Sequence, residues 1–121
     1  MINLQKYSPA YQEAVEILYA PPFKQQILTA GILYPIIEEL IFRGALFGLL
    51  RKKLSFVWAM TISAVVFGIY HGNLVQFVYA GLIGFLFAFY CEKYKTLVAP
   101  IVSHITMNTV IIVLTEIIGR L

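Results

Sequence analysis

Residues 36–43 read Ile-Ile-Glu-Glu-Leu-Ile-Phe-Arg, so two adjacent carboxylates and an arginine lie within a stretch otherwise apolar enough to cross a bilayer. A charged side chain costs about 2.5 kcal/mol or more at the centre of a membrane helix. Ionisable residues in such a place need a reason to be there. The cluster Glu38, Glu39 and Arg43 is therefore our first hypothesis for a functional site.

The composition around this cluster is that of an integral membrane protein. The chain has 121 residues, of which 60% are hydrophobic and 12% charged, and its mean hydropathy is +0.83. A membrane-spanning helix needs roughly 20 residues, so this length allows about four crossings and a short extra segment. Since hydrocarbon cannot satisfy an open strand edge, we predict an all-α fold, a polytopic membrane helix bundle.

Breaks in the apolar runs place the elements. Ser8-Pro9 is a plausible helix start and Pro21-Pro22 a stop, so we predict a short interfacial helix within residues 1–22 and the membrane domain in residues 23–121. The membrane helices are expected at residues 25–50, 54–70, 74–91 and 96–115.

Charge outside the helices indicates topology. The basic loops at residues 51–53 and 93–95 are one hairpin apart, so they share a membrane face, which the positive-inside rule makes cytoplasmic. The net charge of +3 then reflects this topology and anionic lipid headgroups, and we expect the lipid bilayer and no nucleic acid as a partner. Cys91 is the single cysteine, which excludes an internal disulfide.

Small residues recur four apart along the predicted helices. They are Gly44 and Gly48, then Ala64, Gly68 and Gly72, then Ala80, Gly84 and Ala88. Such spacing lets membrane helices approach closely. We therefore predict a compact bundle.

Helical geometry separates the roles of the two adjacent glutamates. Glu39 and Arg43 are four residues apart and can form a direct ion pair. Glu38 points about 100° away from Glu39, so we expect it to face another neighbour and to remain uncompensated. The alternative is that the cluster snorkels to the interface or belongs to a re-entrant loop.

Two histidines complete the polar inventory. His71 ends the segment that begins at Phe67, and His104 shares a helix face with Asn108. With Glu38 as general base and His71 orienting water, His104 and Asn108 could donate to an oxyanion. Alternatively Glu38, His71 and His104 could hold a zinc ion with one open position, or the His104–Asn108 pair could only join helices. The sequence leaves these alternatives open.

Other intramembrane protease chemistries fit the residues less well. The chain has no Asp for a paired-aspartate site, no His-Glu-x-x-His helix, and no serine in a Gly-x-Ser-Gly context. Ser103 adjoins His104, but adjacent side chains on one helix diverge by about 100°. We therefore do not expect a serine nucleophile.

The three polar motifs resemble those of the CPBP family, the CAAX protease and bacteriocin-processing group that is also called Abi and includes type II CAAX prenyl endopeptidases. Glu-Glu-x-x-x-Arg stands at residues 38–43, Phe-x-x-x-His at residues 67–71, and His-x-x-x-Asn at residues 104–108. The resemblance covers roughly residues 32–115. Its motifs are weak singly and specific in this order within apolar helices.

This resemblance implies an intramembrane endopeptidase. Glu38 and His71 would activate water, His104 and Asn108 would stabilise the oxyanion, and Glu39 and Arg43 would support the site. Members are described both as metalloproteases and as metal-independent glutamate proteases, so Zn stays an open alternative. Members commonly carry further helices before the Glu-Glu helix, so we expect a short or truncated member here.

Substrate and location follow as expectations. We expect a membrane-embedded or lipidated peptide as the substrate, in CAAX-type processing, bacteriocin maturation or self-immunity, at a bacterial plasma membrane. The same polar pocket would also suit a non-catalytic immunity or peptide-binding protein, or a proton or ion conduit.

Depth in the membrane is the main difficulty for this hypothesis. At about 1.5 Å per residue, His71 lies about 27 Å from the basic loop before its helix, whereas Glu38 and His104 lie about 20 and 14 Å from theirs. Tilt, a kink or a second helix that begins outside the membrane must remove about 10 Å.

Overall fold

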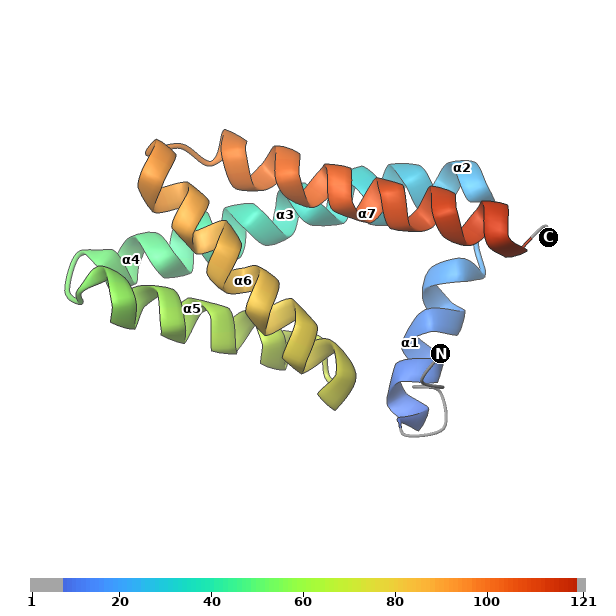
Figure 1. Cartoon of the computed structure of the whole chain (residues 1–121), viewed down its shortest axis with the longest axis horizontal. Coiled ribbons are helices and arrows are strands. Elements are labelled where there is room, and N and C mark those ends of the chain that lie inside the picture. The colour runs from blue at the N-terminus through green and yellow to red at the C-terminus, as the bar shows by residue number, and fades with distance from the viewer. Residues whose placement is uncertain (1–7, 120–121) are drawn as a thin grey trace.

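A computed structural model describes residues 8–119, and within that range the chain is helical with no β-strand (Figure 1). The elements in order are α1 (Pro9–Tyr19), α2 (Phe23–Gln26), η2 (Ile27–Leu33), α3 (Tyr34–Glu39), η3 (Leu40–Phe47), α4 (Gly48–Arg51), α5 (Phe56–Tyr70), α6 (Leu74–Tyr94) and α7 (Val98–Gly119). Each helix predicted from the sequence is present, and the all-α prediction is confirmed.

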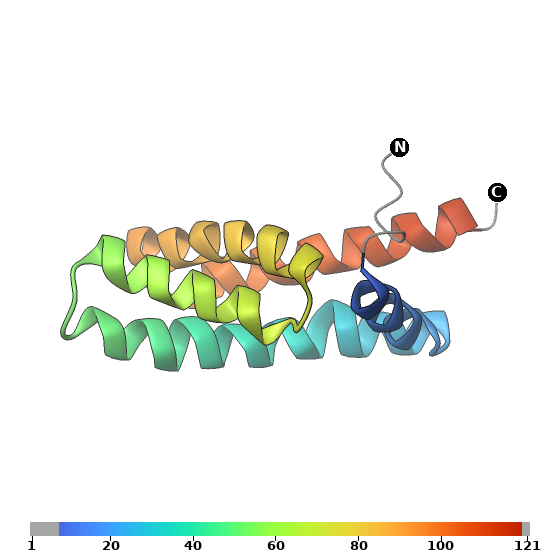
Figure 2. The same cartoon turned by 90° about the horizontal axis from the view of Figure 1, so that it is seen from below.

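Residues 23–51 form one continuous rod that runs along most of the molecule (Figure 2). Two parts of this rod, η2 and η3, are π-helical. They directly precede and follow α3, whose last two residues are Glu38 and Glu39. The sequence did not predict these π segments, which are rare in proteins and frequently occur at functional sites.

The remaining long helices cover different parts of the rod. Helix α7 packs against η2 and α3, and α5 packs against η3. Helices α5 and α6 form an extensively packed hairpin, and α6 also contacts α7 and η3. In Figure 1, α6 crosses the rod obliquely. As a result, α3 lies between η2, which α7 covers, and η3, which α5 and α6 contact.

Length and surface character are those expected of a membrane protein. Helices α6 and α7 have 21 and 22 residues and are apolar enough to cross a membrane, and their lengths match a hydrocarbon core of about 30 Å. Their outer faces expose large apolar side chains such as Leu82 (66%) and Ile118 (67%). The chain is an all-α membrane helix bundle, in which α5 is shorter, with 15 residues.

Helix α1 is attached loosely to this bundle. Its N-cap is Ser8, whose hydroxyl accepts a hydrogen bond from the backbone N–H of Tyr11, and none of its residues is buried. The linker after it is held by Gln26, whose Nε2 donates to the carbonyl oxygens of Tyr19 (3.2 Å) and Pro21 (2.7 Å). The predicted helix is confirmed, while its position at the membrane interface stays a prediction.

The two basic loops lie at the same end of the bundle, as the sequence predicted. The Arg51 Nε and Nη2 atoms donate to the two carboxylate oxygens of Glu92 at 3.0 and 2.9 Å. Lys95 Nζ adds a contact of 3.1 Å to the same carboxylate. These contacts join the end of the rod to the end of α6.

Small residues allow α5 and α6 to pack closely. A Cβ atom on Gly68 would lie 2.8 Å from the carbonyl oxygen of Phe77, and one on Gly84 would lie 3.2 Å from the Cα atom of Ala64. A backbone atom cannot move aside as a flexible side chain can. The predicted close helix approach is therefore confirmed at these two positions.

We expect Gly68→Ala to destabilise the protein by about 1–3 kcal/mol, because the added methyl group overpacks the contact with the Phe77 backbone. Gly48→Ala is the matched control, since its Cβ would meet only the Arg43 carbonyl at an ordinary 3.9 Å. Thermal unfolding in detergent measures both variants. Equal melting temperatures for the two variants would contradict this packing argument.

Candidate active site

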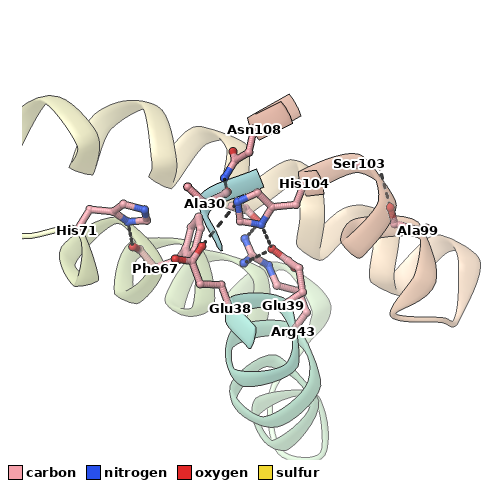
Figure 3. A network of polar contacts seen from close by, with 11 residues as sticks. Ala30, Glu38, Glu39, Arg43, Phe67, His71, Ala99, Ser103, His104 and Asn108 are labelled. Carbon is pink, nitrogen blue, oxygen red and sulfur yellow. Dashed lines mark hydrogen bonds and ion pairs between the residues drawn. The ribbon is translucent and has the colours of Figure 1, made fainter. Parts of the chain in front are cut away.

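Glu39 is the centre of a buried polar network at the end of α3 (Figure 3). Its side chain is fully buried, and its Oε1 atom accepts hydrogen bonds from Arg43 Nη1 at 3.0 Å and His104 Nδ1 at 2.7 Å. The ion pair predicted from the four-residue spacing is confirmed. The additional bond to His104 joins the rod to α7.

Arg43 is surrounded on several sides by groups that suit a buried cation. Besides Glu39, its Nη2 atom donates to the Gly84 carbonyl at 3.3 Å. The guanidinium carbon lies 4.3 Å from the ring centroid of Phe67 and 5.3 Å from that of Phe87, within the range of cation–π attraction. A Cβ on Gly84 would lie 3.2 Å from this Nη2, so a small residue makes room for the charge.

The expectation that Glu38 faces a neighbour different from those of Glu39 is wrong. Its Oε2 atom lies 3.6 Å from His104 Nε2, while Glu39 binds Nδ1 of the same ring. The directions of adjacent side chains do diverge, but the two nitrogens lie on different sides of an imidazole ring. Glu38 and Glu39 therefore flank one histidine.

His71 caps the end of α5 and lies beside Phe67. Its Nδ1 atom is 2.8 Å from the Phe67 carbonyl oxygen, and because a carbonyl can only accept, Nδ1 carries the hydrogen. The Nε2 atom of neutral His71 is then left with its lone pair. The Phe67 ring stands edge-on to the His71 ring, with centroids 4.9 Å apart, and to the His104 ring, with centroids 6.0 Å apart.

Asn108 is turned toward the rod. Its Nδ2 atom donates to the carbonyl oxygen of Ala30, in η2, at 3.0 Å. A side-chain amide nitrogen carries two hydrogens, so one N–H of the predicted oxyanion donor is used in this contact and the other is not.

One cavity of about 290 Å³ brings all four predicted catalytic residues together. Glu38, His71, His104 and Asn108 line it, and part of its wall comes from α1. The expected depth mismatch is reduced because α5 begins at Phe56 and has only 15 residues, which span about 22 Å, and because α6 crosses the rod obliquely (Figure 1).

The proposed zinc ligands are not gathered around one point. Within residues 8–119, no three His, Cys, Asp or Glu side chains are placed to hold a metal ion. Glu38 and His104 face each other, whereas His71 lies apart from both in Figure 3. The donor set therefore does not fit a three-ligand zinc site in this arrangement, and zinc stays a prediction.

Sequence reasoning missed several residues around the network. Phe87 stacks at a tilt against His104, with ring centroids 4.9 Å apart, and also faces Arg43. Gly84 and Ala30 contribute backbone carbonyls. The small-residue repeat pointed to close packing at Gly84, but no sequence signal distinguished Phe87 from its aromatic neighbours or indicated which carbonyls accept.

The chain is similar to known membrane proteases. Residues 21–110 match the family described as type II CAAX prenyl endopeptidase Rce1-like. The chain belongs to this family. The Rce1-like match covers the rod, α5, α6 and the part of α7 that carries His104 and Asn108, so it includes every residue of the buried polar network.

Two curated relatives are also similar to the Rce1-like chain. It is 37% identical over 114 residues to a Bacillus subtilis protein named "Putative membrane peptidase YdiL", covering 94% of this chain and 46% of the relative. It is 28% identical over 116 residues to the "Membrane-embedded CAAX protease MroQ" of Staphylococcus aureus, covering 90% and 46%. The chain thus spans about half the length of these relatives. No solved structure matches significantly.

We expect Arg43→Gln to destabilise the protein by about 3–5 kcal/mol, because it leaves the buried Glu39 carboxylate without its cation. Arg51→Gln is the matched control. It removes an ion pair with Glu92 that is partly exposed, and such pairs contribute little to stability. Thermal and denaturant unfolding in detergent compare the two variants. A larger loss for Arg51→Gln would contradict the proposed compensation of the buried charge.

Proposed function

We propose that this chain is an intramembrane endopeptidase that hydrolyses a peptide bond with water activated by Glu38. The observation that carries the proposal is the pairing of Glu38 Oε2 with His104 Nε2 across 3.6 Å, at the wall of a cavity that also contains His71 and Asn108. Membership of the Rce1-like family supports the same reaction class.

Water activation is assigned to Glu38 and His71. The Glu38 carboxylate would take a proton from a cavity water as its oxygen attacks the carbonyl carbon of the substrate. Because Nδ1 of His71 is bonded to the Phe67 carbonyl, the Nε2 lone pair is suited to orient that water by accepting its second hydrogen. General base catalysis of this kind raises the reaction rate by about 10²- to 10⁴-fold.

Stabilisation of the resulting oxyanion is assigned to His104 and Asn108. His104 donates to Glu39 through Nδ1, so the protonated ring would carry a second hydrogen on Nε2, directed toward Glu38 and the cavity. The second N–H of Asn108 would be the other donor. Each such donor raises kcat by about 10²- to 10³-fold. As the tetrahedral intermediate collapses, the protonated Glu38 would return its proton to the leaving amine.

Charge balance favours this arrangement within a membrane. With Glu38 and Glu39 ionised, and Arg43 and His104 protonated, the four formal charges sum to zero. A buried charge without compensation is costly in a medium of low dielectric constant. The network thus offers an ionised base and a cationic donor together without a net charge inside the bilayer.

The substrate is proposed to be a membrane-embedded or lipidated peptide, and the location a bacterial plasma membrane. The cavity is lined mainly by apolar and aromatic side chains from α1, α6 and α7, such as Leu18, Ile83 and Ile111. Such walls suit an apolar peptide segment. The bacterial relatives include one named as a CAAX protease, which favours substrates cut near a C-terminal aliphatic segment.

We expect Glu38→Gln and Glu38→Ala to lower cleavage of a quenched fluorescent peptide by about 10²-fold or more, because each removes the proposed base. The peptide would end in a farnesylated Cys-aliphatic-aliphatic-X sequence, with an unmodified version in parallel. Glu13→Gln, which removes an exposed carboxylate from α1, is the matched control.

The assay also separates the alternative functions. Cleavage at the wild-type rate by both Glu38 variants would refute the proposal. Peptide binding without cleavage by the wild-type protein would instead favour a binding or immunity role, and a pH gradient dissipated in liposomes would favour a conduit. A parallel series with a chelator tests the dependence on a metal ion.

A further inference from the structure

The two π-helical segments of the rod receive hydrogen bonds from neighbouring helices. A π turn bonds each N–H to the carbonyl five residues earlier, so its carbonyls point differently from those of an α-helix. In hydrocarbon, a backbone group displaced in this way must find its partner inside the protein. Side chains that donate hydrogen bonds to the η2 and η3 carbonyls are therefore candidates for stabilising the π turns.

Serine and threonine hydroxyls of the membrane helices donate to backbone carbonyls in two different ways. Four of those described donate to the carbonyl four residues earlier in their own helical run, and these are Thr29, Thr61, Ser103 and Thr106. Two others donate to a backbone carbonyl of a different helix. Ser63 Oγ donates to the Phe42 carbonyl in η3 at 3.2 Å, and Thr109 Oγ1 donates to the Gly31 carbonyl in η2 at 3.5 Å.

Both hydroxyls that donate to a carbonyl of another helix therefore reach a π-helical carbonyl, whereas Thr115 Oγ1 contacts the Tyr19 hydroxyl of α1 at 3.3 Å. Asn108 adds a third contact to a π-helical carbonyl through Ala30. Of the two hydroxyls, Ser63 is fully buried and makes the shorter bond, so it offers the clearer case.

Ser63 is connected to the buried polar network through the backbone of η3. Its acceptor, Phe42, immediately precedes Arg43, which binds Glu39, which in turn binds His104. If η3 relaxed to α-helical bonding, the residues beyond the altered turn would rotate by up to about 100° about the helix axis relative to Glu39. Glu39 and Arg43 would remain neighbours, because a four-residue spacing also suits an α-helix, but the Arg43 guanidinium would turn relative to the Gly84 carbonyl and Phe87 of α6.

We propose that Ser63 is a positioning residue, whose hydrogen bond to the Phe42 carbonyl holds the π turn of η3 and thereby places the Arg43 guanidinium between Glu39 and the Gly84 carbonyl of α6. The role in catalysis rests on the proposed endopeptidase function. The effect on the geometry of the network does not. Ser63 touches none of the reacting groups and acts through the backbone of the rod.

The chain has only two histidines, which makes a direct measurement practical. In protein labelled with ¹⁵N-histidine and held in detergent micelles, the Nδ1–H signal of His104 reports its hydrogen bond to Glu39. The Nδ1–H signal of His71, which is bonded to Phe67, serves as an internal reference. Spectra of His71→Gln assign the two signals.

We expect Ser63→Ala to shift the His104 Nδ1–H signal, because Arg43 and His104 donate to the same Glu39 oxygen and a displaced guanidinium changes the bond that His104 makes, and to leave the His71 signal unchanged. Where the wild-type protein cleaves peptide, we expect kcat to fall between about tenfold and 100-fold, as misplacement of catalytic groups does, with KM nearly unchanged. Thr61→Ala, which removes a hydroxyl from the same helix without breaking a contact between helices, should change neither property.

A more conservative variant keeps the inference testable if Ser63→Ala does not fold. Ser63→Cys keeps the side-chain volume and a weaker S–H donor, so its His104 signal should shift in the same direction by a smaller amount. An unshifted His104 signal in folded Ser63→Ala would overturn the inference, as would an unshifted signal in Ser63→Cys if the alanine variant fails to fold. Lack of peptide cleavage by the wild-type protein would refute the proposed function alone, because the NMR comparison still decides the role of Ser63.

Discussion

The structure depends on a buried carboxylate that must be neutralised within a membrane protein. Glu39 is fully buried, and its partners come from two elements, with Arg43 in the same rod and His104 in α7. Removing a charge from water costs several kcal/mol, which only a close, well-oriented partner offsets. The helix contacts around α3 can be understood from this requirement, because Gly84, Phe67 and Phe87 all contribute to the surroundings of the Arg43 cation.

Apolar patterning and motif spacing predicted the helices and the residues of the candidate site. The ion pair of Glu39 with Arg43 follows from a four-residue spacing, and the shared cavity of Glu38, His71 and His104 follows from the scarcity of ionisable residues in an apolar chain. The π segments could not be predicted in this way. Their hydrogen-bond pattern leaves no trace in hydropathy, and the donors that reach them, such as Ser63, look like ordinary small helix residues.

The position of Glu38 shows the limit of reasoning from a single helix. The geometry of one helix correctly separates the directions of adjacent side chains. It cannot show that another helix, α7, places the ring of His104 next to both glutamates. The two nitrogens of His104 accommodate Glu38 and Glu39 together. The cavity likewise could not be derived from one helix, because α1 contributes to its wall although none of the α1 residues is buried.

The π-helical segments also bear on how this protein tolerates changes in chain length. A π turn can be regarded as an α-helix that holds one inserted residue. A single deletion within η3 would therefore restore regular α-helix and leave α4 facing nearly the same way relative to the glutamates, because the widened turn already absorbs the extra residue. Arg51 would still align with Glu92. A deletion in an α-helical part of the rod would instead turn every residue beyond it by about 100°. The rod therefore tolerates the loss of a residue better in its π segments than in α3.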